Sequence, residues 1–283
     1  MNAVGPPRSV PSVKTPLNVL AVSPHLDDAA FSAGATLATL IAHGHRVTLV
    51  TAFTASVEPA SDFAIACQAN MGVPPGVDVM AMRRVEDMEA AARLGVHRLV
   101  HLPFPEAQYR GYDSREALFG PLRKDDDVAP DLRAALDVLG GFDLILAPLA
   151  LGDHVDHRQL RRALGLPGRW DDPPPVARFS RGPLALWRDT PHVLRGDDPP
   201  TPGDDAVVVS GDALRRKLAA CACYTSQLGA QFGGERRMRE QLSDLAFAEG
   251  SRHGCPAPAE SFAPATPVIQ ALRQPHHPGS RAA

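Results

Sequence analysis

Two short clusters of histidine and aspartate hold the types of side chain that bind a catalytic metal ion. The first is H-L-D-D at residues 25–28, and the second is G-D-H-V-D-H at residues 152–157. Two imidazoles and one carboxylate are an ordinary ligand set for catalytic zinc, which keeps a further position open for water or substrate. The two clusters together therefore predict a metal-dependent enzyme.

Each cluster alone also has a simple structural interpretation. Asp28 precedes a predicted helix, so the first cluster could be a turn that ends in a helix N-cap. His154 and His157 could lie in a solvated loop or interact with the dipole of a helix. The occurrence of both clusters directly after predicted strands favours the metal site over these alternatives.

The elements that must position these residues are strands and helices in alternation. Continuous apolar or β-branched runs predict strands at residues 18–22, 46–53, 97–102 and 142–147, and apolar residues at helical spacing predict helices at residues 29–43, 83–94 and 128–139. This order predicts βαβ units, and hence a Rossmann-like α/β fold with a mostly parallel sheet and helices on both faces. Ligands of such sheets bind at the carboxyl edge of the strands, where both clusters would lie.

The second half of the chain has a weaker pattern. We expect strands at residues 176–181, 184–188 and 206–210 and helices at residues 212–223 and 235–249. Residues 1–16 and 251–283 are rich in proline and lack apolar periodicity, so we expect flexible tails there. A single α/β domain would then span residues 17–250.

Composition excludes several classes of partner. The formal net charge is −3 and no block of lysine and arginine stands out, so a nucleic-acid or anionic-membrane binder is not expected. No apolar stretch is long enough to cross a bilayer. The four cysteines include Cys221 and Cys223, whose spacing is too short for a C-x-x-C site, and we expect free thiols in a reducing cytoplasm. The oligomeric state is not indicated.

The clusters also carry a resemblance to a known family. H-L-D-D, then G-A-T-L at residues 34–37, then G-D-H-V-D-H resembles the LmbE-like (PIG-L) family of zinc-dependent N-acetylglucosamine deacetylases, which usually reads A-H-P-D-D-E, G-G-T-L and H-x-D-H. The resemblance covers roughly residues 17–230. Leu26, Ala29 and Ala35 depart from the family pattern, but none of these positions is a metal ligand or base in the family. The H-L-D-D-A form is most similar to the branch that acts on aminosugars of natural products, including glycopeptide antibiotics.

This resemblance implies a metal ion and a base. The family's zinc ligands correspond to His25, Asp28 and His157, with one zinc ion per chain, and its general base corresponds to Asp27. Zinc lowers the pKa of water toward ~7, and a neighbouring carboxylate can then accept the proton as the water attacks an amide carbonyl.

The resemblance also implies roles for further residues. His154 would stabilise the oxyanion or protonate the leaving amine, and Asp156 would orient the His154 imidazole. Arg83, in an R-x-x-E sequence at the start of a helix, and Glu106, in the loop after the third strand, would bind sugar hydroxyls. Arg83 and the glutamate three residues later could instead be an ordinary ion pair on a helix surface.

We therefore expect zinc-dependent hydrolysis of the N-acyl amide of an N-acetylglucosaminyl group on a small molecule or natural product. One alternative is an amidase or deacetylase of a thiol-bearing pseudodisaccharide or its conjugate. An alternative of another class is a non-catalytic, receiver-like module in which Asp27 and Asp28 bind magnesium. Such a module has no use for His154, Asp156 and His157, and the sequence lacks a matching phosphoacceptor aspartate.

Overall fold

A seven-stranded sheet forms the centre of the molecule. The computed structural model describes residues 15–58, 61–168, 172–176, 179, 181–196, 201 and 203–273. The strands are β1 (Asn18–Ser23), β2 (Arg46–Phe53), β3 (Arg98–Phe104), β4 (Leu144–Pro148), β5 (Leu184–Trp187), β6 (Asp205–Val208) and β7 (Ala259–Ala263). Their order is β3-β2-β1-β4-β5-β7-β6. The neighbouring strands in β3-β2-β1-β4-β5 pair in parallel, and β7 pairs antiparallel with both β5 and β6.

The chain changes direction across the sheet between β1 and β4. It runs outward from β1 through β2 to β3, and then returns to place β4 on the other side of β1. Such a switch point opens a crevice at the carboxyl ends of the two central strands, which is where ligands bind in open α/β sheets. The two histidine and aspartate clusters follow these two strands.

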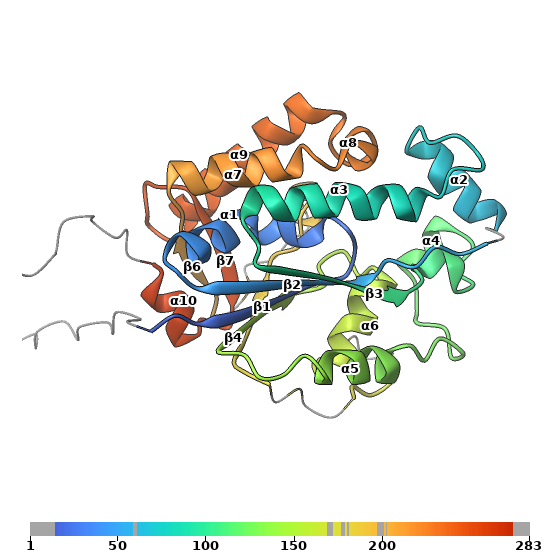
Figure 1. Cartoon of the computed structure of the whole chain (residues 1–283), viewed down its shortest axis with the longest axis horizontal. Coiled ribbons are helices and arrows are strands. Elements are labelled where there is room, and N and C mark those ends of the chain that lie inside the picture. The colour runs from blue at the N-terminus through green and yellow to red at the C-terminus, as the bar shows by residue number, and fades with distance from the viewer. Residues whose placement is uncertain are drawn as a thin grey trace, which may run out of the picture.

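Helices cover both faces of the sheet (Figure 1). The longer helices on one face are α1 (Asp28–Ala42), α3 (Val79–Leu94), α7 (Gly211–Cys221), α8 (Thr225–Phe232) and α9 (Glu235–Arg252), and those on the other face are α5 (Ala129–Asp137) and α6 (Val155–Ala163). Successive residues of β1 alternate between the two cores: Val19 and Ala21 pack in one, Leu20 and Val22 in the other. The described residues also form the helices α2 (Asp62–Asn70), α4 (Arg115–Leu118) and α10 (Pro267–Ala271).

The predicted α/β architecture is confirmed, and so is the mostly parallel sheet. The first four predicted strands coincide with β1 to β4 to within a few residues, as do the helices at α1, α3, α5, α7 and α9. The helices α2, α6 and α8 were not predicted. The strand expected at residues 176–181 is not observed at Val176 or Phe179, and residues 177, 178 and 180 lie outside the described residues.

The prediction of a C-terminal tail from residue 251 is wrong for residues 251–273. Strand β7 lies inside the sheet between β5 and β6, and α10 packs beside β6. The strand is hard to recognise in the short sequence A-E-S-F-A because its second residue is a glutamate. Glu260 is nevertheless buried, because Lys217 on α7 pairs with it at 2.7 Å. The predicted N-terminal tail at residues 1–16 lies outside the described residues except for residues 15 and 16.

Candidate metal centre and active site

The first cluster forms a tight turn between β1 and α1. The Ser23 hydroxyl donates to the carbonyl of His25 at 2.7 Å and accepts from the amide of Ala29 at 3.0 Å. The amide of His25 donates to Oδ2 of Asp28 at 2.9 Å. These bonds close the turn on itself, so the side chains of His25, Asp27 and Asp28 are held at the end of the strand, and all three line one cavity.

The second cluster lies in the loop from β4 to α6 and in the first turn of that helix. The loop contains Ala150, Gly152 and Asp153 with positive φ angles of 65°, 80° and 61°. Two of these are not glycines, and such backbone is uncommon for residues with a side chain. His154 is the N-cap of α6, where its Nδ1 accepts from the amide of Asp156 at 3.2 Å.

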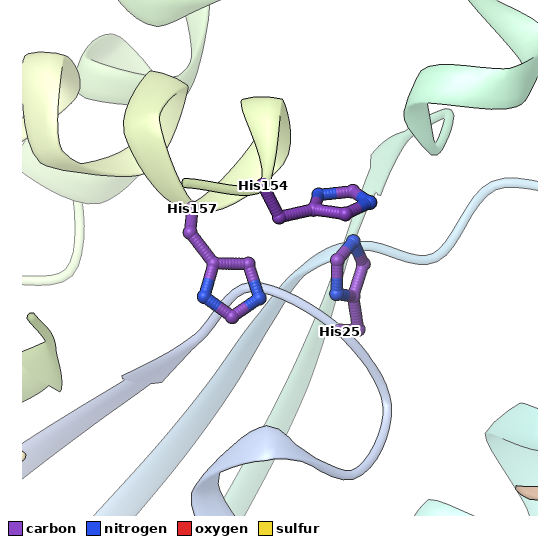
Figure 2. A group of neighbouring side chains, drawn as sticks. All are labelled: His25, His154 and His157. Carbon is purple, nitrogen blue, oxygen red and sulfur yellow. The ribbon is translucent and has the colours of Figure 1, made fainter. Parts of the chain in front are cut away.

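The two clusters meet at the carboxylate of Asp28. Its Oδ2 lies 3.2 Å from Nδ1 of His25 and 3.2 Å from Nε2 of His157. Figure 2 shows the imidazoles of His25, in the turn after β1, and of His154 and His157, at the start of α6, converging, and one nitrogen of each lies within 4.8 Å of the others. The structure thus places the predicted ligands His25, Asp28 and His157 next to one another.

A carboxylate holds the second nitrogen of each predicted histidine ligand. Nε2 of His25 lies 2.9 Å from Oδ2 of Asp156, and Nδ1 of His157 lies 2.8 Å from Oδ1 of Asp189. Metal-binding histidines commonly use their other nitrogen in this way, which fixes the tautomer and the orientation of the ring. The donor set of two so-oriented imidazoles and one carboxylate therefore fits a divalent metal ion with an open position.

The charges at this centre reinforce that fit. Burial would lower the pKa of His157, but the negative charge of Asp28 and the hydrogen bond with Asp189 raise it to about 9. Burial likewise opposes charge on His25, yet its bonds to Asp156 and Asp28 hold its pKa well above the ordinary value. Burial would raise the pKa of Asp28, but His157 and His25 hold it well below the ordinary value. These carboxylates stabilise positive charge at the point where a cation would bind, and the cation would displace protons from both imidazoles.

Asp27 has a different environment from its neighbour. Burial and the adjacent charge of Asp28 raise the pKa of Asp27 to about 7. Its Oδ2 accepts from Nε2 of Gln231 at 2.9 Å and lies 4.0 Å from the Arg83 guanidinium. A carboxylate with this pKa is suited to accepting and releasing a proton near neutral pH, which is what the predicted base requires.

The partner expected for Asp156 is wrong. Its carboxylate contacts His25, the guanidinium of Arg110 at 2.7 Å and the amide of Ala107 at 3.0 Å. The imidazole of His154 instead accepts a hydrogen bond from the backbone amide of Asp156. Asp156 lies two residues beyond His154, in the first turn of α6, and its side chain points to His25 in the turn after β1. Asp156 thus orients the predicted ligand His25.

His154 faces the cavity as a neutral side chain. Its burial and the positive charge of His25 hold its pKa well below the ordinary value. Because Nδ1 accepts the amide of Asp156, the neutral ring carries its proton on Nε2. An Nε2–H beside the metal-binding set can donate a hydrogen bond to an oxygen that gains negative charge.

Arg83 and Glu106 lie on the wall of the same cavity. Their side chains pair at 2.5 Å, and Glu106 also accepts from Nε2 of Gln108 at 2.5 Å. Both are buried, Arg83 in α3 and Glu106 in the loop after β3. The cavity measures about 220 Å³, a volume suited to one sugar ring.

Residues of this site that sequence reasoning missed include Asp189, Gln231, Phe119 and His192. Asp189 follows β5 and holds His157, Gln231 on α8 holds Asp27, and Phe119 and His192 line the cavity. Only Asp189 had a usable signal, an aspartate directly after a predicted strand. His101 forms a hydrogen bond with Asp87 at 2.9 Å, and all four cysteines are free thiols. Among the described residues, no helix is both long and apolar enough to span a membrane.

Comparisons with known proteins agree with this geometry. Residues 20–165, slightly more than half of the chain, match the PIG-L family, described as GlcNAc-PI de-N-acetylase. The 2'-N-acetylparomamine deacetylase of Streptomyces fradiae is 36% identical over 191 residues, a match that covers 63% of this chain and 58% of that enzyme. The chain therefore spans less than two thirds of the length of this curated relative.

Two crystal structures share the fold over most of their length. The A40926 pseudoaglycone deacetylase Dbv21 superposes with a TM-score of 0.67 and 27% identity, over 86% of this chain and 95% of that one. The zinc inhibited form of the teicoplanin deacetylase Orf2 superposes with a TM-score of 0.67 and 25% identity, over 87% of this chain and 96% of that one.

The fold and the site define a class of Rossmann-like α/β proteins that hold a histidine and aspartate metal centre at the switch point of the sheet. Within this class, the chain belongs to the PIG-L family. The predicted resemblance to this family and to its natural-product branch is thereby confirmed. The receiver-like alternative is excluded, because it belongs to another family and leaves the histidine centre without a use.

Proposed function

We propose that this chain is a zinc-dependent deacetylase that hydrolyses the acetamide of an N-acetylglucosaminyl group on a small natural product. The observation that carries the proposal is the convergence of His25, Asp28 and His157. Oδ2 of Asp28 lies 3.2 Å from one nitrogen of each histidine, and the pKa of the neighbouring Asp27 is raised to about 7. Family membership and the names of the deacetylase relatives support the reaction and the substrate class.

In this proposal His25, Asp28 and His157 hold one zinc ion per chain. When bound, zinc would acidify a water molecule and polarise the acyl carbonyl. The donor set supports zinc over magnesium, because imidazole nitrogen is a ligand that zinc accepts and magnesium avoids. Asp156 and Asp189 keep the two imidazoles in place through their second nitrogens.

The chain's own residues would then move the proton and hold the oxygen. Asp27 accepts the proton of the attacking water as the water adds to the acyl carbon. Nε2–H of His154 donates to the acyl oxygen while that oxygen carries negative charge, the kind of preorganised donor that stabilises such a transition state. Asp27, now protonated, returns its proton to the sugar nitrogen, so that the C–N bond breaks and the free amine leaves.

Arg83 and Glu106 would place the sugar. Their paired charges form a polar wall next to Asp27, and a carboxylate and a guanidinium together can bind adjacent sugar hydroxyls. The partner is therefore a small aminosugar substrate. A cytoplasmic location stays a prediction from the four free thiols.

The test is direct. Purified full-length chain is analysed for zinc by mass spectrometry and incubated with N-acetylglucosaminyl glycosides, and the free amine is measured. We expect about one zinc per chain and amine release that chelation abolishes and zinc restores. Zinc-loaded, folded protein that releases no amine from any N-acetylglucosaminyl compound would overturn the proposal.

A further inference from the structure

The wall of the catalytic cavity has two chemically different parts. Amide, carboxylate and guanidinium groups form the part nearest Asp27, from Arg83, Glu106, Gln108, Gln227 and Gln231. Rings from Phe119, Pro191 and His192 form the other part, which Arg195 borders. The ring of Phe119 contacts His154 edge-on with centroids 5.3 Å apart, and His192 contacts His157 with centroids 5.9 Å apart. Phe119 and His192 also contact each other at 6.1 Å.

The position of His192 is fixed by the residues around it. It lies close against Gly152, where a Cβ atom would stand 2.2 Å from Nδ1 of His192. The chain leading to it is fixed at two points, because Asp189 bonds His157 and the amide of Thr190 donates to the Ser32 hydroxyl at 3.0 Å. Gly152 is the first residue of the second cluster, so the motif itself leaves room for the His192 ring. The ring wall is therefore a fixed part of the site.

The two parts of the wall match the two ends of the scissile amide. One end is a sugar ring with several hydroxyl groups, which suits the polar part. The other end is an acyl chain without hydrogen-bonding groups beyond its carbonyl. If His154 receives the acyl oxygen, the acyl carbons lie beside the rings in contact with the metal-centre histidines.

We propose that Phe119 and His192 form the acyl-binding wall and restrict the substrate to the acetyl group. This inference rests on the proposed function. Because these rings contact each other and also His154 and His157, a longer acyl chain meets them with each added methylene. Differences of one methylene in such pockets change kcat/KM by about 10- to 200-fold.

The experiment compares N-acetyl- and N-butyrylglucosaminyl glycosides with the same aglycone. We expect the wild type to favour the acetyl substrate in kcat/KM by at least about 10-fold. His192→Ala and Phe119→Ala should each raise the butyryl-to-acetyl ratio by about 10-fold or more. His192→Leu, which refills the space, should keep the wild-type ratio. Zinc content and thermal unfolding of every variant identify any that fail to fold, and Phe119→Leu replaces Phe119→Ala in that case.

Gln108→Ala is the matched control, a truncation of similar size in the polar part of the wall. It should lower kcat/KM for both substrates by the same factor and leave the ratio unchanged. Gly152→Ala should lower acetyl turnover because its Cβ pushes His192 into the cavity, and His192→Ala in the same chain should restore part of it, as a double-mutant cycle would measure.

The outcomes separate the two proposals. A wild type that deacetylates the acetyl substrate, with an acyl ratio unmoved in His192→Ala and Phe119→Ala, would overturn the acyl wall alone. A ratio shifted as strongly by Gln108→Ala would also overturn it. Absence of amine release from either substrate by zinc-loaded wild type would overturn the proposed function itself.

Discussion

Two of the regions that bury charged side chains lie along α1. At the first turn of the helix, Asp28 meets His25 and His157 at the cavity. Further along the same helix, Glu260 of β7 accepts from the amides of Ala35 at 3.1 Å and Thr36 at 2.6 Å. Lys217 of α7 lies 2.7 Å from Glu260.

The two regions differ in the surroundings of their charged groups. The Lys217–Glu260 pair is closed: the carboxylate has three donors, and the lysine stem crosses α1 at Gly34, where a Cβ would stand 3.1 Å from Cγ of the lysine. At the metal centre, Asp156 holds one nitrogen of His25 and Asp189 holds one nitrogen of His157. The other nitrogen of each ring faces Asp28 at the cavity. Buried charge alone therefore does not indicate chemistry, whereas converging donors beside a cavity do.

The largest expected effect comes from the metal-centre region. His25→Ala, Asp28→Ala and His157→Ala should each lose zinc and nearly all turnover, because each removes one of three donors. Zinc per chain and amine release are measured on the same preparations. Lys217→Met, in the closed region, should retain zinc. Full zinc in all three alanine variants would mean that the ion is bound elsewhere.

Asp27→Asn should keep zinc but lose turnover by about 10²-fold or more, since an amide cannot accept a proton. The base must be ionised, so wild-type turnover should fall as the pH falls through the pKa of Asp27, about 7 in the metal-free site. A bound cation favours the carboxylate, so the midpoint should lie at that pH or lower. Loss of zinc in Asp27→Asn with retention in Asp28→Asn would show that the two roles are exchanged.

His154→Ala should reduce kcat by about 10²-fold with zinc retained, the usual loss for one oxyanion donor. The physical reason is that its neutral imidazole, which carries its proton on Nε2, converges with the imidazoles of His25 and His157. His154→Asn, which can still donate, should lose less. Near-normal turnover in His154→Ala would mean that the oxyanion has another partner.

Asp156→Asn and Asp189→Asn should weaken zinc binding by about 10- to 100-fold, the usual cost of removing a carboxylate that holds a metal-binding histidine. Zinc affinity measured against a chelator is the direct readout. The Asp156→Asn variant distinguishes between two interpretations. If Asp156 holds His25, the substitution weakens zinc affinity, whereas if it held His154, the substitution would lower turnover alone. Unchanged zinc affinity in Asp156→Asn would contradict the contact seen with His25.

The metal-centre region and the Lys217–Glu260 region also differ in how far the sequence could predict them. The convergence of His25, Asp28 and His157 was predictable because these residues lie in two local patterns that follow β1 and β4, so the sheet alone brings them together. Asp27 and His154 share those patterns. Asp189 and His192 come from the segment after β5, whose position depends on the strand order, and no local pattern in the segment indicates that order.

The closed region could not be predicted at all. A glutamate inside the five-residue strand β7 argues against burial unless its partner is known, and Lys217 is 43 residues away in the sequence. The tail assignment failed there for this reason. The same logic explains α6, where Arg158 is buried because it pairs with Asp172, a contact between residues that no periodicity connects.

The smallest effect on turnover, and a clear effect on stability, should come from the closed region. Lys217→Met leaves the Glu260 carboxylate buried without its cation, and breaking one partner of a buried pair costs about 3–5 kcal/mol. At about 2–4 °C per kcal/mol for a chain of this size, the melting temperature should fall by roughly 10 °C, while turnover per zinc-loaded folded molecule stays at the wild-type value. Lys124→Met is the control, because Lys124 is an exposed lysine and its loss should change stability by no more than about 0.5 kcal/mol. If Lys217→Met unfolded no earlier than Lys124→Met, or changed turnover without changing zinc content, the separation of the molecule into a chemical and a structural charged region would be wrong.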